Sequence, residues 1–404
     1  MHTSRHIELD KLSLNPPAVL KDYQRKCIAV AGLFGLLTIV CFIVDFHQAM
    51  QAYLVGFMMF VGLTLGPLGM LLTWFMPGGR WGLTMRRIWE AGARNIWVAA
   101  IAFIPILLGY KVLYPWADPN VVNHSENLTR LAHNFLNFPG FLIRGIAYFA
   151  VWGIVVFLVN RFSLIQDKPY EGWLGGKLTA LGAVGVLAYI WAMSFASIDW
   201  VMSLTPGWPS TIFPLLIIAG QGILGLAIGI IGGSILVKYG PMDVLMDDVV
   251  FHDNGKLLFA FVMLWAYFSF SQWLIIWSGN LPEEIHWFRD RTLDGWGGVA
   301  LFLVVFHFAV PFAILLSQGL KKKPAKLAAV AAWMIFMRFV DLFWVVAPSF
   351  NREHFAIGKV WMYPVVSLAM VGIWGLLFFR NLMSRPLIAA YDPRLVQIYG
   401  ETHE

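Results

Sequence analysis

The sequence has 404 residues, of which 59% are hydrophobic and 13% are charged. A soluble domain carries about a quarter charged residues, so this chain, with a mean hydropathy of +0.69, lacks the polar side chains that would cover a water-soluble surface. The formal net charge of +6 is therefore interpreted loop by loop, as in a membrane protein, and does not indicate nucleic-acid binding.

The first 26 residues are polar and predict a cytoplasmic N-terminal segment. Ten apolar runs follow, each long enough to cross the hydrocarbon core as a helix of about 20 residues. We expect these spans at 27–45, 51–76, 94–114, 141–160, 177–204, 211–237, 256–279, 297–319, 326–347 and 360–380. The runs are continuous, which excludes the alternating strands of a membrane barrel. The sequence predicts an all-α integral membrane protein, with a ten-helix membrane domain at 27–380 and a cytoplasmic C-terminal tail at 381–404.

Basic residues fall mostly on one side of these spans. With the N-terminus inside, 21 of the 29 Lys and Arg residues lie in inside segments, 6 lie in outside loops and 2 lie within spans. Cytoplasmic loops carry such an excess of Lys and Arg. The distribution predicts an N-in/C-in topology, and a miscounted helix would have removed the asymmetry.

Two spans end in similar ways. Span five contains Asp199, with Pro206 seven residues later, and span nine contains Asp341, with Pro348 seven residues later. Both helices run from inside to outside, and duplicated helical units are common in membrane proteins. The match predicts two four-helix bundles, at about 51–205 and 211–347, plus flanking helices.

The second bundle carries polar residues at membrane depth. Ionisable groups there cost about 2.5–3.5 kcal/mol each on insertion scales. Counting 1.5 Å per helical residue puts His307 and Arg338 near the midplane, and Asp341 lies one turn further out on the face of Arg338. Three uncharged polar residues extend this track, namely Gln221, Tyr267 and Gln272.

Two interpretations of this track remain open. Arg338 and Asp341 can form a buried ion pair that fixes helix register, with His307 as a satisfied core histidine. Alternatively, the three residues form part of a proton path, because a neutral imidazole has a pKa close to ambient pH.

The first bundle has one notable pair. Arg144 and Asp199 are predicted at a common depth near the outer surface, and Ser197 lies two residues before Asp199. The pair either locks two helices together or provides a carboxylate that exchanges protons at the outer face.

Several cofactor classes lack ligands in this sequence. The chain has two cysteines, Cys27 and Cys41, and no Cys-x-x-Cys-His motif, so we expect no metal site, iron–sulfur cluster or c-type haem. A b-type haem between helices needs two facing histidines, and only His307 is deep in a span. We therefore expect no redox cofactor bound by this chain, and no ATP-driven motor, since a phosphate-binding loop is also missing.

One stretch resembles a known family. It reads Ser-Phe-Ala-Ser-Ile-Asp-Trp-Val-Met-Ser-Leu-Thr-Pro-Gly-Trp-Pro-Ser-Thr-Ile-Phe-Pro and covers 194–214. This stretch closely resembles the signature of the ActF family, the shorter of the two NrfD-like (polysulfide-reductase-like) membrane subunits of bacterial alternative complex III, a quinol:cytochrome c oxidoreductase. The chain length, the ten spans, the duplicated bundles and the region of Asp341 also fit that family.

The resemblance implies a set of partners and a location. The family's complex contains a second NrfD-like membrane subunit, multihaem and monohaem cytochromes c and an iron–sulfur subunit, in the bacterial inner membrane. Haem c and iron–sulfur clusters would then be held by partner subunits, with quinol as the diffusible carrier. A quinone contact of this chain would fall on Asp199, Arg144 and Ser197.

The sequence thus predicts a membrane subunit of a quinol:cytochrome c oxidoreductase that contributes a proton-conducting path, a quinone contact, or both. Two alternatives compete with this prediction, a freestanding secondary transporter and a purely structural membrane anchor for electron-transfer subunits. Transporters often have broken helices around a midplane site, and here only span two, with Pro67, Gly62 and Gly66, shows such a signal.

Overall fold

A computed structural model describes residues 15–123, 126–167, 174–293, 295–350, 357–389, 391–392 and 394–395. The described chain is helical and contains no strand. Residues 1–14 and 396–404 of the two predicted terminal segments lie outside the described residues, and the cytoplasmic location of both segments stays a prediction.

Ten helical segments are long and apolar enough to cross a membrane within the part of the chain that the structure describes. The predicted all-α, multi-pass fold is therefore confirmed. The ten are α1 (Val19–Val44), α2 (Phe46–Phe75), the run of α4 (Arg86–Ala93), α5 (Ile96–Ala102) and α6 (Ile104–Leu108), α10 (Phe138–Ile165), α11 (Gly175–Trp200), α12 (Phe213–Leu236), α14 (Asp248–Gly279), the run of α16 (Trp296–Leu303), η4 (Val304–Ala309) and α17 (Val310–Leu316), α19 (Pro324–Val346) and α20 (Met362–Met383).

Short helices and turns connect these segments. They are α3 (Arg80–Leu83), α7 (Tyr110–Leu113), η2 (Pro115–Ala117), α8 (Pro119–Val122), α9 (Glu126–Asn134), η3 (Met202–Leu204), α13 (Met242–Leu245), α15 (Pro282–Arg289), α18 (Gln318–Lys321), η5 (Ala347–Ser349) and η6 (Ile357–Lys359).

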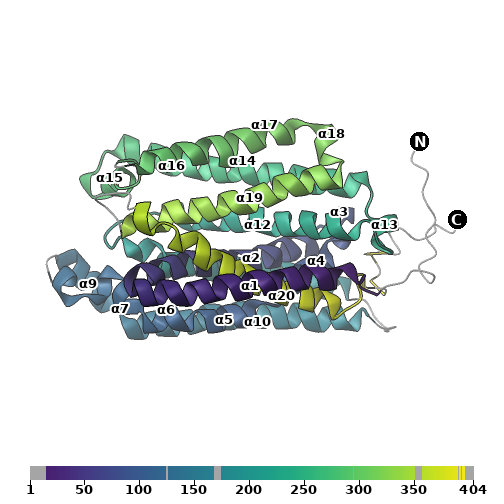
Figure 1. Cartoon of the computed structure of the whole chain (residues 1–404), viewed down its shortest axis with the longest axis horizontal. Helices are drawn as coiled ribbons and strands as arrows, with labels where there is room; N and C mark the ends of the chain where they lie inside the picture. The colour runs from purple at the N-terminus through teal and green to yellow at the C-terminus, as the bar shows by residue number, and fades with distance from the viewer. Residues whose placement is uncertain are drawn as a thin grey trace.

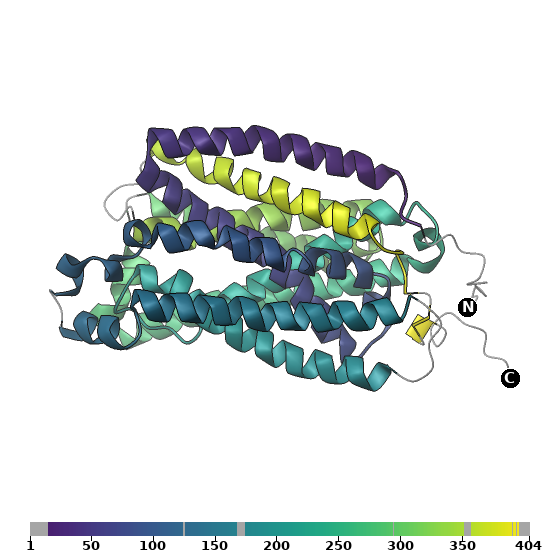
Figure 2. The ribbon, with the colours of Figure 1, turned by 90° about the horizontal axis from the view of Figure 1, so that it is seen from below.

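The long helices run side by side along the longest axis of the molecule (Figure 1). One group consists of α2, α4–α6, α10 and α11, and a second consists of α12, α14, α16–α17 and α19. Helices α1 and α20 lie against each other and flank α2, as Figure 2 shows from below. We call the two ends of the molecule the α15 end and the α13 end. Helix α1 begins, and α20 ends, at the α13 end (Figure 1).

Helices α2 and α12 form the centre of the molecule, and each is the first helix of its group. They are the most buried of the ten candidate spans. Their backbones touch at Gly66 and Gly225: a Cβ on Gly66 would lie 2.2 Å from the Gln221 carbonyl oxygen, and one on Gly225 would lie 2.3 Å from that of Gly66. Small residues permit such close approach of membrane helices. These two glycines therefore join the two groups.

Replacing Gly66 by alanine is expected to lower the free energy of unfolding by about 1–3 kcal/mol, the usual cost of overpacking a close-packed interior. The matched control is Gly35→Ala on α1, where a Cβ would meet nothing within 4 Å and alanine has the better helix propensity. Thermal unfolding in detergent measures both variants. Equal midpoints for the two would contradict the role of Gly66 in joining the groups.

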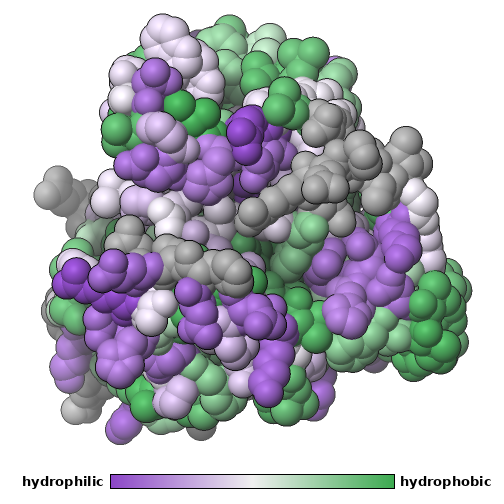
Figure 3. Space-filling view, turned by 90° about the vertical axis from the view of Figure 1, so that its left-hand side faces the viewer, coloured by the Kyte–Doolittle hydropathy of each residue, from purple (hydrophilic) through white to green (hydrophobic). Residues whose placement is uncertain are grey.

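The α15 end carries the longer connections. Hydrophilic residues gather over it, and hydrophobic ones lie mainly toward its rim (Figure 3). Asp45, between α1 and α2, accepts a hydrogen bond from the Gln48 backbone N–H at 3.0 Å and so caps α2. The Lys359 ammonium donates to the other carboxylate oxygen of Asp45 at 2.5 Å, which ties the start of α2 to the segment before α20.

A pH dependence follows from this contact. The hydrogen bond from Lys359 holds the pKa of Asp45 below its ordinary value of 3.8. A carboxyl with a lowered pKa stabilises the fold above its unfolded pKa, and this contribution disappears as the pH falls through the lowered value. Asp45→Asn keeps an N-capping side chain but removes the titration. We expect the difference in unfolding midpoint between the parent and Asp45→Asn to shrink as the pH falls below about 4. A difference that is constant with pH would contradict this role.

Candidate functional site

Three of the predicted polar residues come together inside the second group. Arg338 and Asp341, one turn apart on α19, form a buried ion pair. The Trp265 indole N–H on α14 also donates to Asp341, at 3.2 Å. The His307 imidazole is fully buried and stacks on the Trp265 ring, with centroids 4.1 Å apart. Trp265 of α14 thus contacts both the Asp341 carboxylate of α19 and the His307 imidazole of η4, while Arg338 pairs with that carboxylate.

His307 lies in a π-helical segment, η4, that interrupts span eight. Its wider turn has a visible cause in Pro311, which has no N–H and whose ring clashes with a preceding carbonyl in a regular α-helix. The Val310 N–H bonds to the Val305 carbonyl, five residues back. The next carbonyl, that of Phe306, instead accepts the Trp333 indole N–H at 2.9 Å. Single-turn π-helices of this kind are frequent at functional sites.

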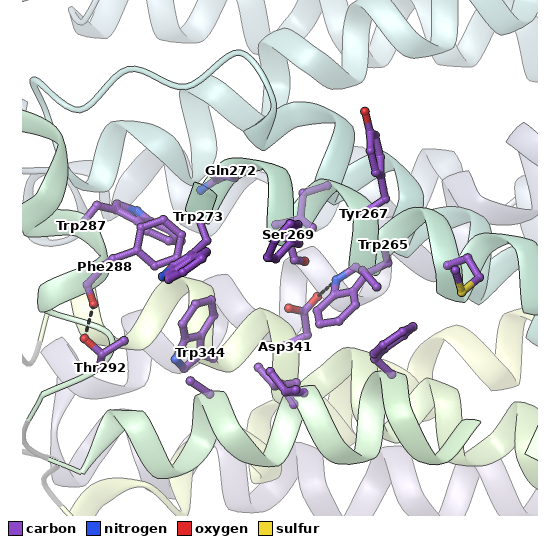
Figure 4. Close-up of a pocket in the computed structure, with 18 residues that line it drawn as sticks. Trp265, Tyr267, Ser269, Gln272, Trp273, Trp287, Phe288, Thr292, Asp341 and Trp344 are labelled. Atoms are coloured by element: carbon purple, nitrogen blue, oxygen red, sulfur yellow. Dashed lines mark hydrogen bonds between the residues drawn. The ribbon is translucent and has the colours of Figure 1, made fainter. Parts of the chain in front are cut away.

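A cavity of about 670 Å³ adjoins this cluster. We call it the α14–α16 cavity: α14 supplies eight of its lining residues, and Ala300 and Leu303 of α16 also line it. Trp287, Phe288 and Thr292 lie at its end nearest α15, and Trp265 and Asp341 lie deeper (Figure 4). Helix α14 packs along η4 and α17, whereas α16 packs on α19. The two helices therefore separate toward the α15 end, and the cavity occupies the space between them.

The uncharged polar residues of the predicted track are divided. Gln272 is buried and lines the cavity. Tyr267 lies at the mouth with 64% of its surface exposed, and Figure 4 shows it pointing away from Asp341. Gln221 accepts a hydrogen bond from Tyr189 of α11 at 2.7 Å and so faces the first group. The guanidinium of Arg338 lies against Gly220, the residue before Gln221. These contacts extend the polar interior from α19 through α12 to α11.

In the first group, Arg144 and Asp199 form a two-point ion pair with both N–O distances at 2.8 Å. The Tyr148 hydroxyl donates to the same carboxylate at 2.6 Å. Ser197 does not take part, since its hydroxyl donates to the Ser194 carbonyl. The structure thus shows that the two charges predicted at a common depth touch, in a geometry suited to joining α10 and α11. A quinone contact at Arg144, Asp199 and Ser197 stays a prediction.

The two aspartates share a structural setting. Asp199 and Asp341 are both buried beside an arginine, and each precedes a 3₁₀ turn, η3 and η5. The two turns meet at the α15 end, where the hydroxyls of Thr205 and Ser349 lie 3.4 Å apart. The sequence match between the two regions therefore corresponds to two similar helix ends that lie side by side.

A second buried charge cluster, which the sequence did not reveal, lies near the α13 end. Arg86, Arg87 and Arg94 were expected in an inside loop, but the structure places Arg86 and Arg87 in α4, fully buried. Glu90, one turn later, accepts from Arg86 at 2.8 Å, from Arg87 at 3.0 Å and from Ser163 at 2.7 Å. Arg94, which follows α4, instead donates to the Asn381 carbonyl next to the end of α20. We call the set Arg86, Arg87, Glu90, Asp167, Arg385 and Asp392 the inner ionic cluster.

Segments far apart in the sequence supply this cluster. Asp392 follows α20 and accepts from Arg86 at 2.5 Å, and Asp167 follows α10 and accepts from Arg87. Burial raises the pKa of the Asp167 carboxyl, which Arg87 opposes. In the sequence, Glu90 follows Arg87 by three residues and Arg86 by four, a spacing that allows ion pairs within a helix. The sequence alone does not show whether charged residues at the end of a span belong to the buried helix or to the adjoining loop.

No group of His, Cys, Asp or Glu that could hold a metal ion occurs among residues with a described position. No protein-family model and no curated protein matches the chain. The resemblance of residues 194–214 to a known family therefore rests on that stretch and on the general features of the chain.

Proposed function

We propose that this chain is a membrane subunit of a quinol:cytochrome c oxidoreductase, located in the bacterial inner membrane and contributing a proton-conducting path. The observation that carries the proposal is the buried Asp341, which contacts Arg338 and Trp265 beside His307 and next to a cavity. A purely structural anchor has no need for these groups at membrane depth, where each is costly.

The arrangement suits proton transfer. Asp341 is a carboxylate, a group that can accept and release a proton, and it lies in contact with Arg338. His307, across the Trp265 ring, adds a second titratable side chain beside Asp341. The Gln221–Tyr189 hydrogen bond extends the hydrogen-bonding groups toward the first group. Together these residues support a path through the centre of the molecule.

Electron transfer is assigned to partners in this proposal. The sequence has two cysteines and no Cys-x-x-Cys-His motif. In this proposal a second NrfD-like subunit, cytochromes c and an iron–sulfur subunit carry the redox cofactors, with quinol as the electron donor. The excess of basic residues in the predicted inside segments supports an orientation with the α13 end toward the cytoplasm.

Mild-detergent purification through a tag on this chain tests the proposal. We expect further subunits to co-purify and to give the visible absorption bands of reduced c-type haem. An untagged preparation, processed in the same way, controls for haem proteins that bind the resin. A colourless preparation of the chain alone would contradict membership of a cytochrome-containing complex and would favour the transporter alternative.

A further inference from the structure

We infer that the α14–α16 cavity binds the ring of a lipid quinol or quinone, entering sideways from the membrane. This inference rests on the proposed function and adds a site to it, in the second group and away from Asp199. It concerns binding alone, so it requires no electron acceptor on this chain.

The cavity walls favour a flat, apolar ring. Four tryptophans line it, Trp265, Trp273, Trp287 and Trp344, together with three phenylalanines, Phe270, Phe288 and Phe308. Aromatic side chains pack face to face or edge to face with other rings and gain energy beyond the area that they bury. Ligand cavities commonly measure about 300–1,000 Å³, and this one, at about 670 Å³, lies within that range.

Unsatisfied polar atoms indicate what such a ring should carry. The Gln272 side-chain oxygen and the Ser269 hydroxyl are buried, line the cavity and have no hydrogen-bond partner among the described residues. Only 3% of Gln272 is exposed. A buried polar group without a partner costs about 1–3 kcal/mol, so a ligand that supplies the partner would gain that energy. A quinol hydroxyl can donate to Gln272 and accept from Ser269, whereas the hydrocarbon chain of a lipid can do neither.

The route into the cavity leads from the membrane. Met263, Tyr267, Phe270 and Trp273 of α14 and Val304 at the start of η4 line the cavity and are also exposed on the outer surface of the bundle. At the α15 end, Trp287 closes over the cavity, with the Arg291 guanidinium 3.9 Å above its ring. Arg291 itself donates to the Val345 carbonyl at 2.7 Å and holds this cover to α19. A ligand with a long apolar tail could therefore leave its tail in the lipid between α14 and α16.

Two adjacent residues on α16 provide a matched pair of variants. Ala300 lines the cavity, whereas Leu301 does not and is 64% exposed toward the membrane. Ala300→Phe fills the cavity, and Leu301→Phe adds a ring to the same helix outside it. Comparable unfolding midpoints for the two variants would show that Ala300→Phe is folded.

The probe is a photoreactive azido-benzoquinone with a decyl tail, applied to the detergent-purified protein with whatever subunits accompany it. We expect adducts on peptides that contain 265–273 and 287–304, and competition by unlabelled decylbenzoquinone. Ala300→Phe should reduce this labelling about tenfold, a loss of about 1.4 kcal/mol in binding, while Leu301→Phe should not.

Labelling that is equal in the two variants, or that is absent from these peptides, would overturn the inference. Competition by phospholipid but not by decylbenzoquinone would also overturn it, since the cavity would then hold an acyl chain. These results are independent of the haem bands that test the proposed function, because labelling can be measured on a colourless preparation.

Discussion

Asp341→Asn is expected to lower the stability of the protein by about 3–5 kcal/mol, because it leaves the guanidinium of Arg338 buried without a counter-charge. Both side chains are about 1% exposed, so water cannot replace the lost carboxylate. The variant alone would therefore confuse a folding defect with a loss of proton transfer. Its thermal unfolding midpoint in detergent should fall well below that of the parent.

The double variant Arg338→Met with Asp341→Asn separates the two effects. Removing both charges of a buried pair is often neutral or stabilising, and asparagine still offers an acceptor to the Trp265 indole. We expect the double variant to regain most of the lost stability and to assemble with its partners, while proton release and turnover of the complex stay low. Parent-like turnover and proton release in the double variant would contradict the proton path and leave the pair a structural role.

Glu90→Gln is expected to cost a similar amount, about 3–5 kcal/mol. The inner ionic cluster contains three arginines and three carboxylates, and Glu90 is the one that contacts Arg86, Arg87 and Arg385. Glutamine retains the size and can still accept from Ser163, but it leaves one positive charge in excess in a buried site. The unfolding midpoint of the purified variant measures the effect.

The control for Glu90→Gln is Asp253→Asn. Asp253 lies at the same end of the molecule and pairs with Lys256 at 3.1 Å, but both side chains are exposed. Exposed pairs of this kind contribute about 0–1 kcal/mol, so the control should unfold close to the parent. A Glu90→Gln variant that matches this control would show that the cluster contributes little to stability.

The existence of the helical spans was predictable because the length and hydropathy of each apolar run determine it. The residues at which the helices begin and end were predicted less accurately. Helix α1 begins at Val19 and α14 at Asp248, about eight residues before the predicted starts, because the charged residues there are compatible with a helix that continues beyond the hydrocarbon core. Hydropathy marks where a helix enters the membrane and gives no information on how far it extends into water.

The candidate site was predictable in part. His307, Arg338 and Asp341 were identified because an ionisable side chain inside the membrane has a high free-energy cost. Helical spacing placed Arg338 and Asp341 on one face of their helix. Trp265 was one of 19 tryptophans, and nothing local distinguished it. The π-helix at His307 depends on Pro311 and on the Trp333 indole from another helix, and the cavity depends on how α14 and α16 separate. Those features arise from packing between distant segments, which a single sequence does not specify.

The backbone contact between Gly66 and Gly225 has a mechanical consequence. A transporter that works by rocking its two halves needs a surface along which they can tilt or slide. Here the two halves meet through backbones so close that a single methyl group does not fit between them, and a tilt of a few degrees would either drive the chains into each other or open a void. Movement in this protein is therefore expected at the periphery, where α14 and α16 already stand apart, while α2 and α12 remain a fixed axis.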